Sequence, residues 1–291
     1  MKFGVASLHH DEYANKESIN KIAEEAEKLE YDSIWVSDHI ITPVYQGKTY
    51  GYIYESLITL SYLAAKTENL KLGTSILVLP LREPVLVAKQ LATLDQLSNG
   101  RLIVGLGAGW LKEEFDFLKK DFKERGKKMD EYIIFMKKLW SEGTIKQKNE
   151  KEIEYYFEPK PLQKGGPRIL IGGNSKRAII RAVKLGDGWN PVALSPSILE
   201  KKISLLRKVS DTRKMVFLRI GILPEVTHGL RIVKTDQSYY LSGSIRDITE
   251  DLEKYYRLNV DHIIAYFGSV KIDNYIERMK KFRDIMRSFQ S

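Results

Sequence analysis

Residues 84–110 read PVLVAKQLATLDQLSNGRLIVGLGAGW, and this stretch contains one complete helix–strand unit. Pro84 opens the predicted helix at a position where its missing N–H costs nothing, and Ser98-Asn99-Gly100 closes it. Residues 101–105 follow as an apolar run, which is typical of a strand that is covered on both faces. A helix that leads directly into such a strand predicts an α/β protein with a parallel sheet.

The same alternation of apolar runs and amphipathic stretches continues along the whole chain. The strand candidates are residues 3–7, 33–37, 71–76, 101–105, 168–172, 188–191, 216–221 and 262–267. Units that average about 33 residues suit a (β/α)8 TIM barrel, and a doubly wound open sheet is the alternative. We expect one domain that spans residues 1–291.

Two stretches, near residues 142–167 and 223–243, are too long to be ordinary connections, and we interpret them as insertions in the barrel. The first contains residues 144–148 and 152–157, and their pattern predicts a hairpin. The second is expected to close over a substrate as a lid. Its candidate lid side chains are His228, Arg231, Lys234, Tyr239 and Tyr240.

Composition excludes several classes of protein. Of the 291 residues, 43% are hydrophobic and 29% are charged, which is typical of a chain with a sizeable core. The longest run without Asp, Glu, Lys or Arg covers residues 188–199, which is shorter than the roughly 20 residues of a membrane helix. The first apolar stretch breaks at His9, too early for a signal peptide, so we expect a cytoplasmic location. The absence of cysteine excludes disulfides, thiolate catalysis and cysteine metal sites.

The net charge of +9 favours anionic partners only in a general way. Most lysines alternate with acidic residues on predicted helix faces, and the chain contains no nucleic-acid-binding motif. We therefore expect neither nucleic acid nor a membrane as a partner.

In a TIM barrel the active site lies at the C-terminal ends of the strands. The residues that follow the predicted strands are His9, His10 and Glu12, then Asp38 and His39, then Ser75-Ile76, then 105–110, then 172–175 and then 186–190. Glycines gather at these positions, where a flat ring or a phosphate can approach the backbone.

Gly172-Gly173-Asn174-Ser175 stands between a predicted strand and a predicted helix. Its N–H groups would form a phosphate cradle at the positive end of that helix. The alternative is a tight turn in which Ser175 caps the helix. The spacing of Gly105-x-Gly107-x-Gly109 differs from GxGxxG, which argues against a dinucleotide-binding sheet.

His39 is the strongest acid–base candidate, because an imidazole titrates near neutrality. Asp38 precedes it, but neighbouring strand residues point in opposite directions, so Asp38 need not orient the ring. A packing or capping role for His39 is the alternative. His262 begins the last predicted strand, at the stability end of a barrel, and is interpreted as structural.

His9, His10 and Glu12 have no second ligand pair at a suitable spacing, so no metal site is predicted. A metal-dependent hydrolase that uses His9, His10 and Asp38 is kept as a minor alternative.

Three long motifs carry a resemblance to a known family: residues 26–39, AEKLEYDSIWVSDH; residues 71–80, KLGTSILVLP; and residues 84–101 of the opening stretch. Shorter ones are GLGAGW at 105–110, Arg125-Gly126, Ile171-Gly172-Gly173, GDGW at 186–189, LSG at 241–243 and VDH at 260–262. Together they resemble the luciferase-like oxidoreductases, which include bacterial luciferase-like monooxygenases and coenzyme F420-dependent oxidoreductases. The resemblance implies a (β/α)8 barrel.

The resemblance also implies a site. The flavin or deazaflavin ring would lie over the second to fourth strands, backed by a non-proline cis peptide between Ser75 and Ile76. His39 would be the catalytic histidine, and Trp110 would line the substrate side where some deazaflavin relatives have a glutamate. The implied cofactor-binding residues are Asp38, Ser75, Ile76, Gly107, Gly109, Gly172, Gly173, Asn174 and Gly188, with the phosphate on Gly172, Gly173 and Asn174.

Two branches of the family use different cofactors. Residues 38–39, 98–101 and 125–126 resemble the branch that uses coenzyme F420, a deazaflavin, for hydride transfer to or from a small organic substrate. The alternative is an FMN-dependent monooxygenase that takes reduced flavin from a separate flavin reductase. A flavin-binding barrel without catalytic activity is a further alternative. The family also implies a homodimer.

Overall fold

The computed structural model describes residues 1–7, 9–11, 13–148, 152–224 and 238–289. The barrel strands are β1 Lys2–Ala6, β2 Ser33–Val36, β3 Lys71–Val78, β4 Leu102–Gly107, β7 Arg168–Gly172, β8 Gly188–Asn190, β9 Met215–Pro224 and β11 His262–Tyr266. All pair in parallel, and β8 pairs with β9 through Gly188–Met215 and Trp189–Val216. This pairing closes the sheet, so the TIM barrel is confirmed and the open sheet is wrong.

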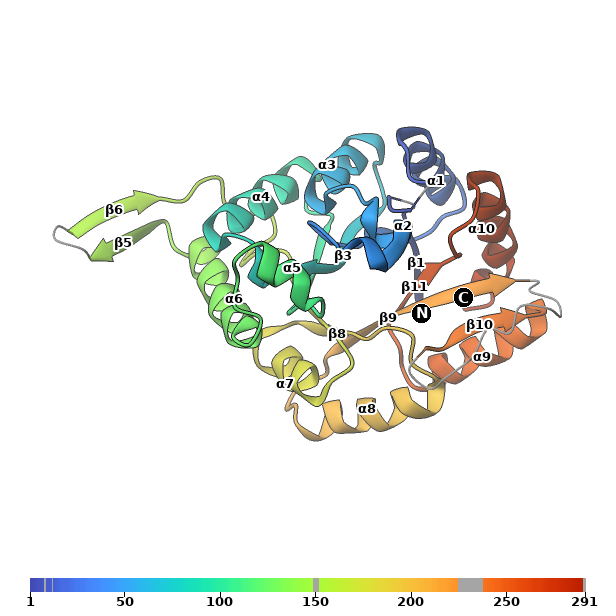
Figure 1. Ribbon diagram of the computed structural model, residues 1–291. Coiled ribbons are helices and arrows are strands. Elements are labelled where there is room, and N and C mark those ends of the chain that lie inside the picture. The colour runs from blue at the N-terminus through green and yellow to red at the C-terminus, as the bar shows by residue number, and fades with distance from the viewer. Residues whose placement is uncertain (8, 12, 149–151, 225–237, 290–291) are drawn as a thin grey trace.

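A ring of helices covers the outside of the barrel (Figure 1). These helices are α1 Lys16–Lys28, α3 Ser56–Lys66, α4 Pro84–Leu97, α6 Arg125–Ser141, α7 Lys176–Leu185, α8 Pro196–Lys208, α9 Ile245–Arg257 and α10 Ile272–Arg287. Short elements occupy three of the connections. The 3₁₀ turn η1 Val44–Gln46 and the helix α2 Gly47–Gly51 follow β2, the 3₁₀ turn η2 Leu79–Leu81 follows β3, and the helix α5 Lys112–Phe117 follows β4. The Met1 ammonium donates to the Phe289 carbonyl at 3.3 Å, so the first residue and the end of the last helix meet.

Local sequence sets the helix ends. Pro84 stands in the first turn of α4, and Asn99 and Gly100, with φ of 53° and 72°, reverse the chain after it as the sequence predicts. At α9 the Ser244 hydroxyl accepts from the Asp247 N–H, and the Asp247 carboxylate accepts from the Ser244 N–H, which is a capping box.

Trp35 of β2 fills the interior of the barrel and is 1% exposed. A Cβ on Gly73 of β3 would lie 2.2 Å from its ring, and a Cβ on Gly4 of β1 would lie 2.5 Å from its Nε1. Glycines on both flanking strands are therefore required to admit the indole. The main hydrophobic core is separate and lies between the sheet and the helices.

Both insertions are present. Strands β5 Thr144–Lys148 and β6 Glu152–Tyr156 pair antiparallel, which confirms the hairpin, and they project from the body of the molecule next to α6 (Figure 1). In the second insertion, β10 Tyr240–Gly243 pairs with the end of β9. The Tyr239 hydroxyl donates to Asp251 of α9 at 2.8 Å.

His228, Arg231 and Lys234 lie outside the described residues, so a lid over the substrate stays a prediction. No described helix combines the length and the apolar composition that crossing a membrane requires.

His262 is structural at the start of β11. The Trp35 indole N–H donates to Ser33 Oγ at 2.6 Å, and the same Oγ lies 2.8 Å from His262 Nε2. The Ser33 hydroxyl, which accepts from Trp35, thus also forms a hydrogen bond with the imidazole of His262. The imidazole also stacks on Phe217 with ring centroids 4.8 Å apart. Burial lowers the pKa of His262 to about 3.

His262 should therefore make stability depend on pH. Between the ordinary pKa of 6.5 and about 3, the unfolded chain binds a proton that the folded chain does not, so the free energy of unfolding falls as the pH falls. The slope from one such group is at most about 1.4 kcal/mol per pH unit. We expect His262→Gln to have a shallower pH dependence than the wild type in urea unfolding at pH 4 to 6.5. Equal slopes in the two proteins would contradict this.

Candidate functional site

Asp38 and His39 follow β2 at the C-terminal end of the barrel and have different partners. His39 Nδ1 lies 3.0 Å from Glu114 Oε2, and the two residues are 7% and 2% exposed. The other Glu114 oxygen accepts from the N–H groups of Ile40 and Ile41 at 2.6 and 3.3 Å. Because a carboxylate accepts, the shared proton belongs to His39 Nδ1, and no described residue bonds Nε2. The ring is thus fixed with one nitrogen available to a ligand.

Two aromatic rings flank His39. The ring centroid of Tyr50 lies 5.1 Å from that of His39, and that of Trp110 lies 5.8 Å away at 88°. Trp110 is 56% exposed. Trp110 therefore lies beside His39, and its role as a wall of the substrate side stays a prediction.

Sequence reasoning missed Glu114. It lies in α5, four residues beyond Trp110, and its partner His39 is 75 positions away in the chain. Glu114 and Phe115 are buried whereas Glu113 is exposed. The only signal in the sequence was a carboxylate beside an aromatic residue in the first turn after the fourth barrel strand.

Asp38 is occupied by protein donors. Its Oδ1 accepts from Ser56 Oγ at 2.8 Å and from Arg82 Nη2 at 2.6 Å, and its Oδ2 accepts from the Val78 N–H at 2.8 Å. Arg82 also donates to Glu55 at 2.8 Å. The carboxylate therefore pins the end of β3 to the end of β2, and a direct contact of Asp38 with a cofactor stays a prediction.

The end of β3 has an irregular backbone. Its register with β4 shifts between Thr74 and Leu77, and the peptide bond between Ser75 and Ile76 is cis, as the resemblance implied. Ser75 Oγ donates to Asn190 Oδ1 at 2.8 Å, and Asn190 Nδ2 donates to the Phe217 carbonyl at 2.6 Å. The Ser75 side chain is therefore fixed across the mouth of the barrel.

Several predicted cofactor glycines have a local packing explanation. A Cβ on Gly107 or on Gly172 would lie 2.3 or 2.4 Å from the Ile76 side chain, so both glycines make room for Ile76. Gly109, with φ of +82°, would meet Phe115 and Val78 in the same way. Gly188 lies at the start of β8, where its Cβ would meet the Met215 carbonyl. The residue of β8 that pairs with Gly172 is Asn190, not Gly188.

The turn before α7 is capped at the helix and bonded along its backbone: the Gly173 N–H donates to the Asn190 carbonyl at 3.3 Å, and the Gly173 carbonyl accepts from the Trp189 indole N–H at 2.8 Å. Ser175 caps α7 by accepting from the Ala178 N–H, as in the alternative interpretation. Asn174 is tied to the backbone of Val192 through its side-chain amide. Gly173 has φ of +112°, and a Cβ there would meet only the Ala178 Cβ, at 3.5 Å. Space beside Gly173 is open at this positive helix end, but its N–H already has a protein acceptor, so a phosphate on Gly172, Gly173 and Asn174 stays a prediction.

His9 is structural. Its Nε2 accepts from the Ser37 N–H at 2.9 Å, so its Nδ1 carries the hydrogen that is donated to the Ser7 carbonyl at 2.9 Å. Burial lowers the pKa of His9, and burial also lowers that of His10, to about 3. Among the residues with a described placement, no three His, Asp or Glu side chains are grouped to hold a metal.

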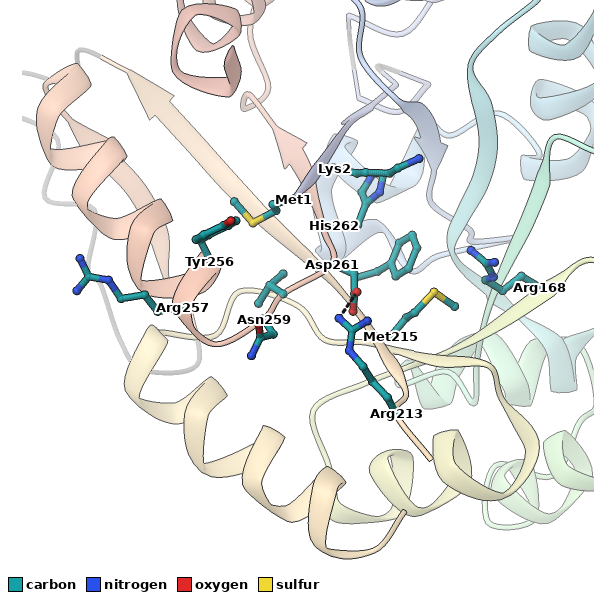
Figure 2. A pocket seen from close by; sticks show the side chains of 12 residues that line it. Met1, Lys2, Arg168, Arg213, Met215, Tyr256, Arg257, Asn259, Asp261 and His262 are labelled. Atoms are coloured by element: carbon teal, nitrogen blue, oxygen red, sulfur yellow. Dashed lines mark hydrogen bonds and ion pairs between the residues drawn. The ribbon is translucent and has the colours of Figure 1, made fainter. Parts of the chain in front are cut away.

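A cavity of about 550 Å³ lies at the opposite end of the barrel, near the starts of β1, β7, β9 and β11 (Figure 2). Arg213 and Asp261 form an ion pair at 2.5 Å within it, and Asp261 also accepts from the Val216 N–H. Arg168 lies on its rim. None of the predicted site residues lines this cavity, so we place the candidate site at the other end.

Comparisons with known proteins agree with this geometry. A family model described as "Luciferase-like monooxygenase" matches residues 1–221. The FMNH(2)-dependent dimethylsulfone monooxygenase of Pseudomonas putida is 35% identical over 47% of this chain and 39% of that protein. The F420-dependent glucose-6-phosphate dehydrogenase of Amycolatopsis mediterranei is 33% identical over 67% of this chain and 62% of that protein. The chain thus spans less than two thirds of both relatives.

Among solved structures, monooxygenase RslO1 from Streptomyces bottropensis has the same fold. It superimposes with a TM-score of 0.82 at 20% identity and covers 100% of both chains.

Asp38→Asn tests the connection between the ends of β2 and β3, here called the Asp38 clamp, that Asp38 makes with Arg82 and the Val78 N–H. The variant removes the buried carboxylate that accepts from Arg82, Ser56 and the Val78 N–H and leaves Arg82 with Glu55 alone, and breaking a buried charge pair costs about 3 kcal/mol. We expect a loss of this size in the free energy of urea unfolding. The matched control is Asp116→Asn, which removes an exposed partner of Lys112 and should leave stability unchanged. Equal stability of the Asp38 and Asp116 variants would show that the clamp is not needed.

Proposed function

The chain belongs to the luciferase-like monooxygenase family and is a flavin- or deazaflavin-dependent oxidoreductase, and on this premise we propose that it uses coenzyme F420 for hydride transfer. The observation that carries the proposal is the hydrogen bond between His39 and Glu114 beside the end of β3. Such a pair supplies an oriented acid–base group, which hydride transfer to or from a carbonyl or imine requires.

The chain's own residues fit the cofactor. The ring would rest against Ser75 and Ile76, and the phosphate would lie beside Gly173, where no side chain blocks the space and α7 begins. Lys176 and Arg177 are exposed in the first turn of α7 and add positive charge there. A bound deazaflavin would give or accept a hydride at its C5.

His39 moves the proton that accompanies the hydride. In the direction that oxidises an alcohol, its Nε2 takes the hydroxyl proton while the hydride leaves the carbon as H⁻, and in the reverse direction it returns that proton to the carbonyl oxygen. Glu114 stabilises the charged imidazole and holds its Nδ1. Trp110 and Tyr50 cover the ring of His39 and limit the access of water.

An FMN-dependent monooxygenase is the second candidate. The similarity to the dimethylsulfone monooxygenase of Pseudomonas putida supports it. In that case the partner would be a flavin reductase that delivers reduced FMN. The greater share of this chain that matches the F420-dependent relative favours the deazaflavin. Homodimer formation and a cytoplasmic location stay predictions.

Equilibrium binding tests the cofactor. We expect oxidised coenzyme F420 to bind the purified protein at least about tenfold more tightly than oxidised FMN or, under anaerobic conditions, reduced FMN. A preference for reduced FMN would support the monooxygenase instead. Binding of none of the three would overturn both candidates.

Substitutions at the acid–base pair test the mechanism. His39→Ala should lower turnover by about 10²–10⁴-fold with unchanged cofactor affinity, because the proton has no carrier. Glu114→Gln should lower kcat by about ten- to hundredfold, because the ring loses its orientation. The matched control Glu113→Gln makes the same change at the exposed neighbour and should keep the wild-type kcat. Turnover of His39→Ala within about threefold of the wild type would exclude the proton-transfer role.

A further inference from the structure

Arg219 of β9 reaches across the mouth of the barrel. Its Nη1 donates to Ser37 Oγ at 2.7 Å and also to the Ser75 carbonyl. Ser37 lies two residues before His39, and Ser75 lies where the ring of the proposed cofactor would rest. The guanidinium is therefore placed at the floor of the candidate site.

Most of the donor capacity of Arg219 is unused. Both of its side-chain hydrogen bonds come from Nη1, and among the described residues Nε and Nη2 have no acceptor. Arg219 is half-buried, and neither of these two nitrogens is fully enclosed. Nε and Nη2 together form the side of a guanidinium that binds a carboxylate through two parallel bonds.

Another buried arginine shows that the fold satisfies a guanidinium when no ligand is expected. Arg101 has no carboxylate partner in the described part of the chain, but it donates through Nε, Nη1 and Nη2. Its acceptors are Thr67 Oγ1 and the carbonyls of Ala64, Thr67, Leu70 and Ser98. In Arg219, in contrast, Nε and Nη2 have no acceptor among the described residues.

Among the described residues, no carboxylate contacts Arg219 directly; the buried carboxylate in its surroundings is Asp11, which lies beside His10. Within the described residues, the titratable groups that act on Arg219 are Tyr50, Tyr266 and Tyr275. The positive charge of Arg219 in turn acts on His9 and His10, and burial keeps both imidazoles neutral.

Two further polar atoms at this mouth lack partners. Ser7 Oγ and His10 Nδ1 are buried without a hydrogen bond, although Asp11 Oδ2 lies 3.8 Å from His10 Nδ1, and Ser7 and His10 are 0% and 4% exposed. Ser7 follows β1 and its N–H donates to the Trp35 carbonyl, which places it beside the end of β2. Buried polar groups without partners cost free energy unless a ligand or water supplies the missing bond.

We propose that Arg219 is the anion-binding residue of the site and that it takes a planar oxyanion through Nε and Nη2, with Ser7 and His10 as further polar contacts. The free two-nitrogen fork fits a carboxylate of the organic substrate. The other source of the same chemistry is the negatively charged N1–C2 edge of a reduced flavin or deazaflavin ring. The inference names the substrate class of the proposed oxidoreductase and in that respect rests on the proposed function.

Calorimetric titration of the cofactor-free protein with benzoate tests the proposal. We expect benzoate to bind the wild type and the neutral isostere benzamide to bind at least about tenfold more weakly, because only the anion meets the fork. Arg219→Gln should weaken benzoate binding by about ten- to hundredfold. The matched control Arg168→Gln removes the same charge at the other end of the barrel and should bind as the wild type does (Figure 2).

A second variant and a second measurement cover two cases: a variant that does not fold, and a wild type that does not bind benzoate. If Arg219→Gln does not fold, Arg219→Lys keeps the charge but loses the fork, and its affinity for benzoate should fall several-fold. If benzoate does not bind the wild type, the affinities of oxidised and reduced coenzyme F420 are compared in the wild type and Arg219→Gln. Loss of a preference for the reduced form in the variant assigns the anion to the ring.

Some results would overturn the anion site. These are equal binding of benzoate and benzamide, equal weakening in the Arg219 and Arg168 variants, or no effect of Arg219 on either probe. Failure of coenzyme F420 to bind, with Arg219-dependent benzoate binding intact, would overturn the proposed function and leave the anion site in place.

Discussion

The hydrogen bond between His39 and the buried Glu114 carboxylate is the interaction on which the candidate site depends. Three donors from the segment after β2 converge on Glu114, so this segment cannot move independently of α5. Helix α5 is only six residues long and is anchored by Phe115, which is fully buried in a cluster with Val78 and Leu81. The position of the imidazole is therefore determined by packing around the ends of β3 and β4.

The fold was predictable from the sequence because its signals are local and repeat. Apolar runs that alternate with amphipathic stretches fixed the order of strands and helices, and Pro84 and Gly100 marked real helix ends. His39 was predictable because it follows a strand. Glu114 was not, because the pairing joins positions 75 residues apart, which the order of β2, β3 and β4 in the sheet brings together.

Glycine was an ambiguous signal for the site. Gly107 and Gly172 were assigned to the cofactor, but both make room for the Ile76 side chain, and Gly188 packs at the start of β8. A missing Cβ marks a close approach without identifying what approaches. The sequence could not decide between deazaflavin and FMN either, because relatives with either cofactor match this chain at similar identity. Gly107 and Gly172 contact Ile76, and Asp38 contacts Arg82 and Val78.

Glu114 fixes His39 with its proton on Nδ1 and leaves Nε2 to the ligand. Nitrogen-15 NMR of histidine-labelled protein at neutral pH, with His39 assigned through His39→Gln, measures the protonation of the two ring nitrogens directly. We expect Nδ1 of His39 to be protonated, because it faces the Glu114 carboxylate. A proton on Nε2 alone, with Nδ1 bare, would contradict it.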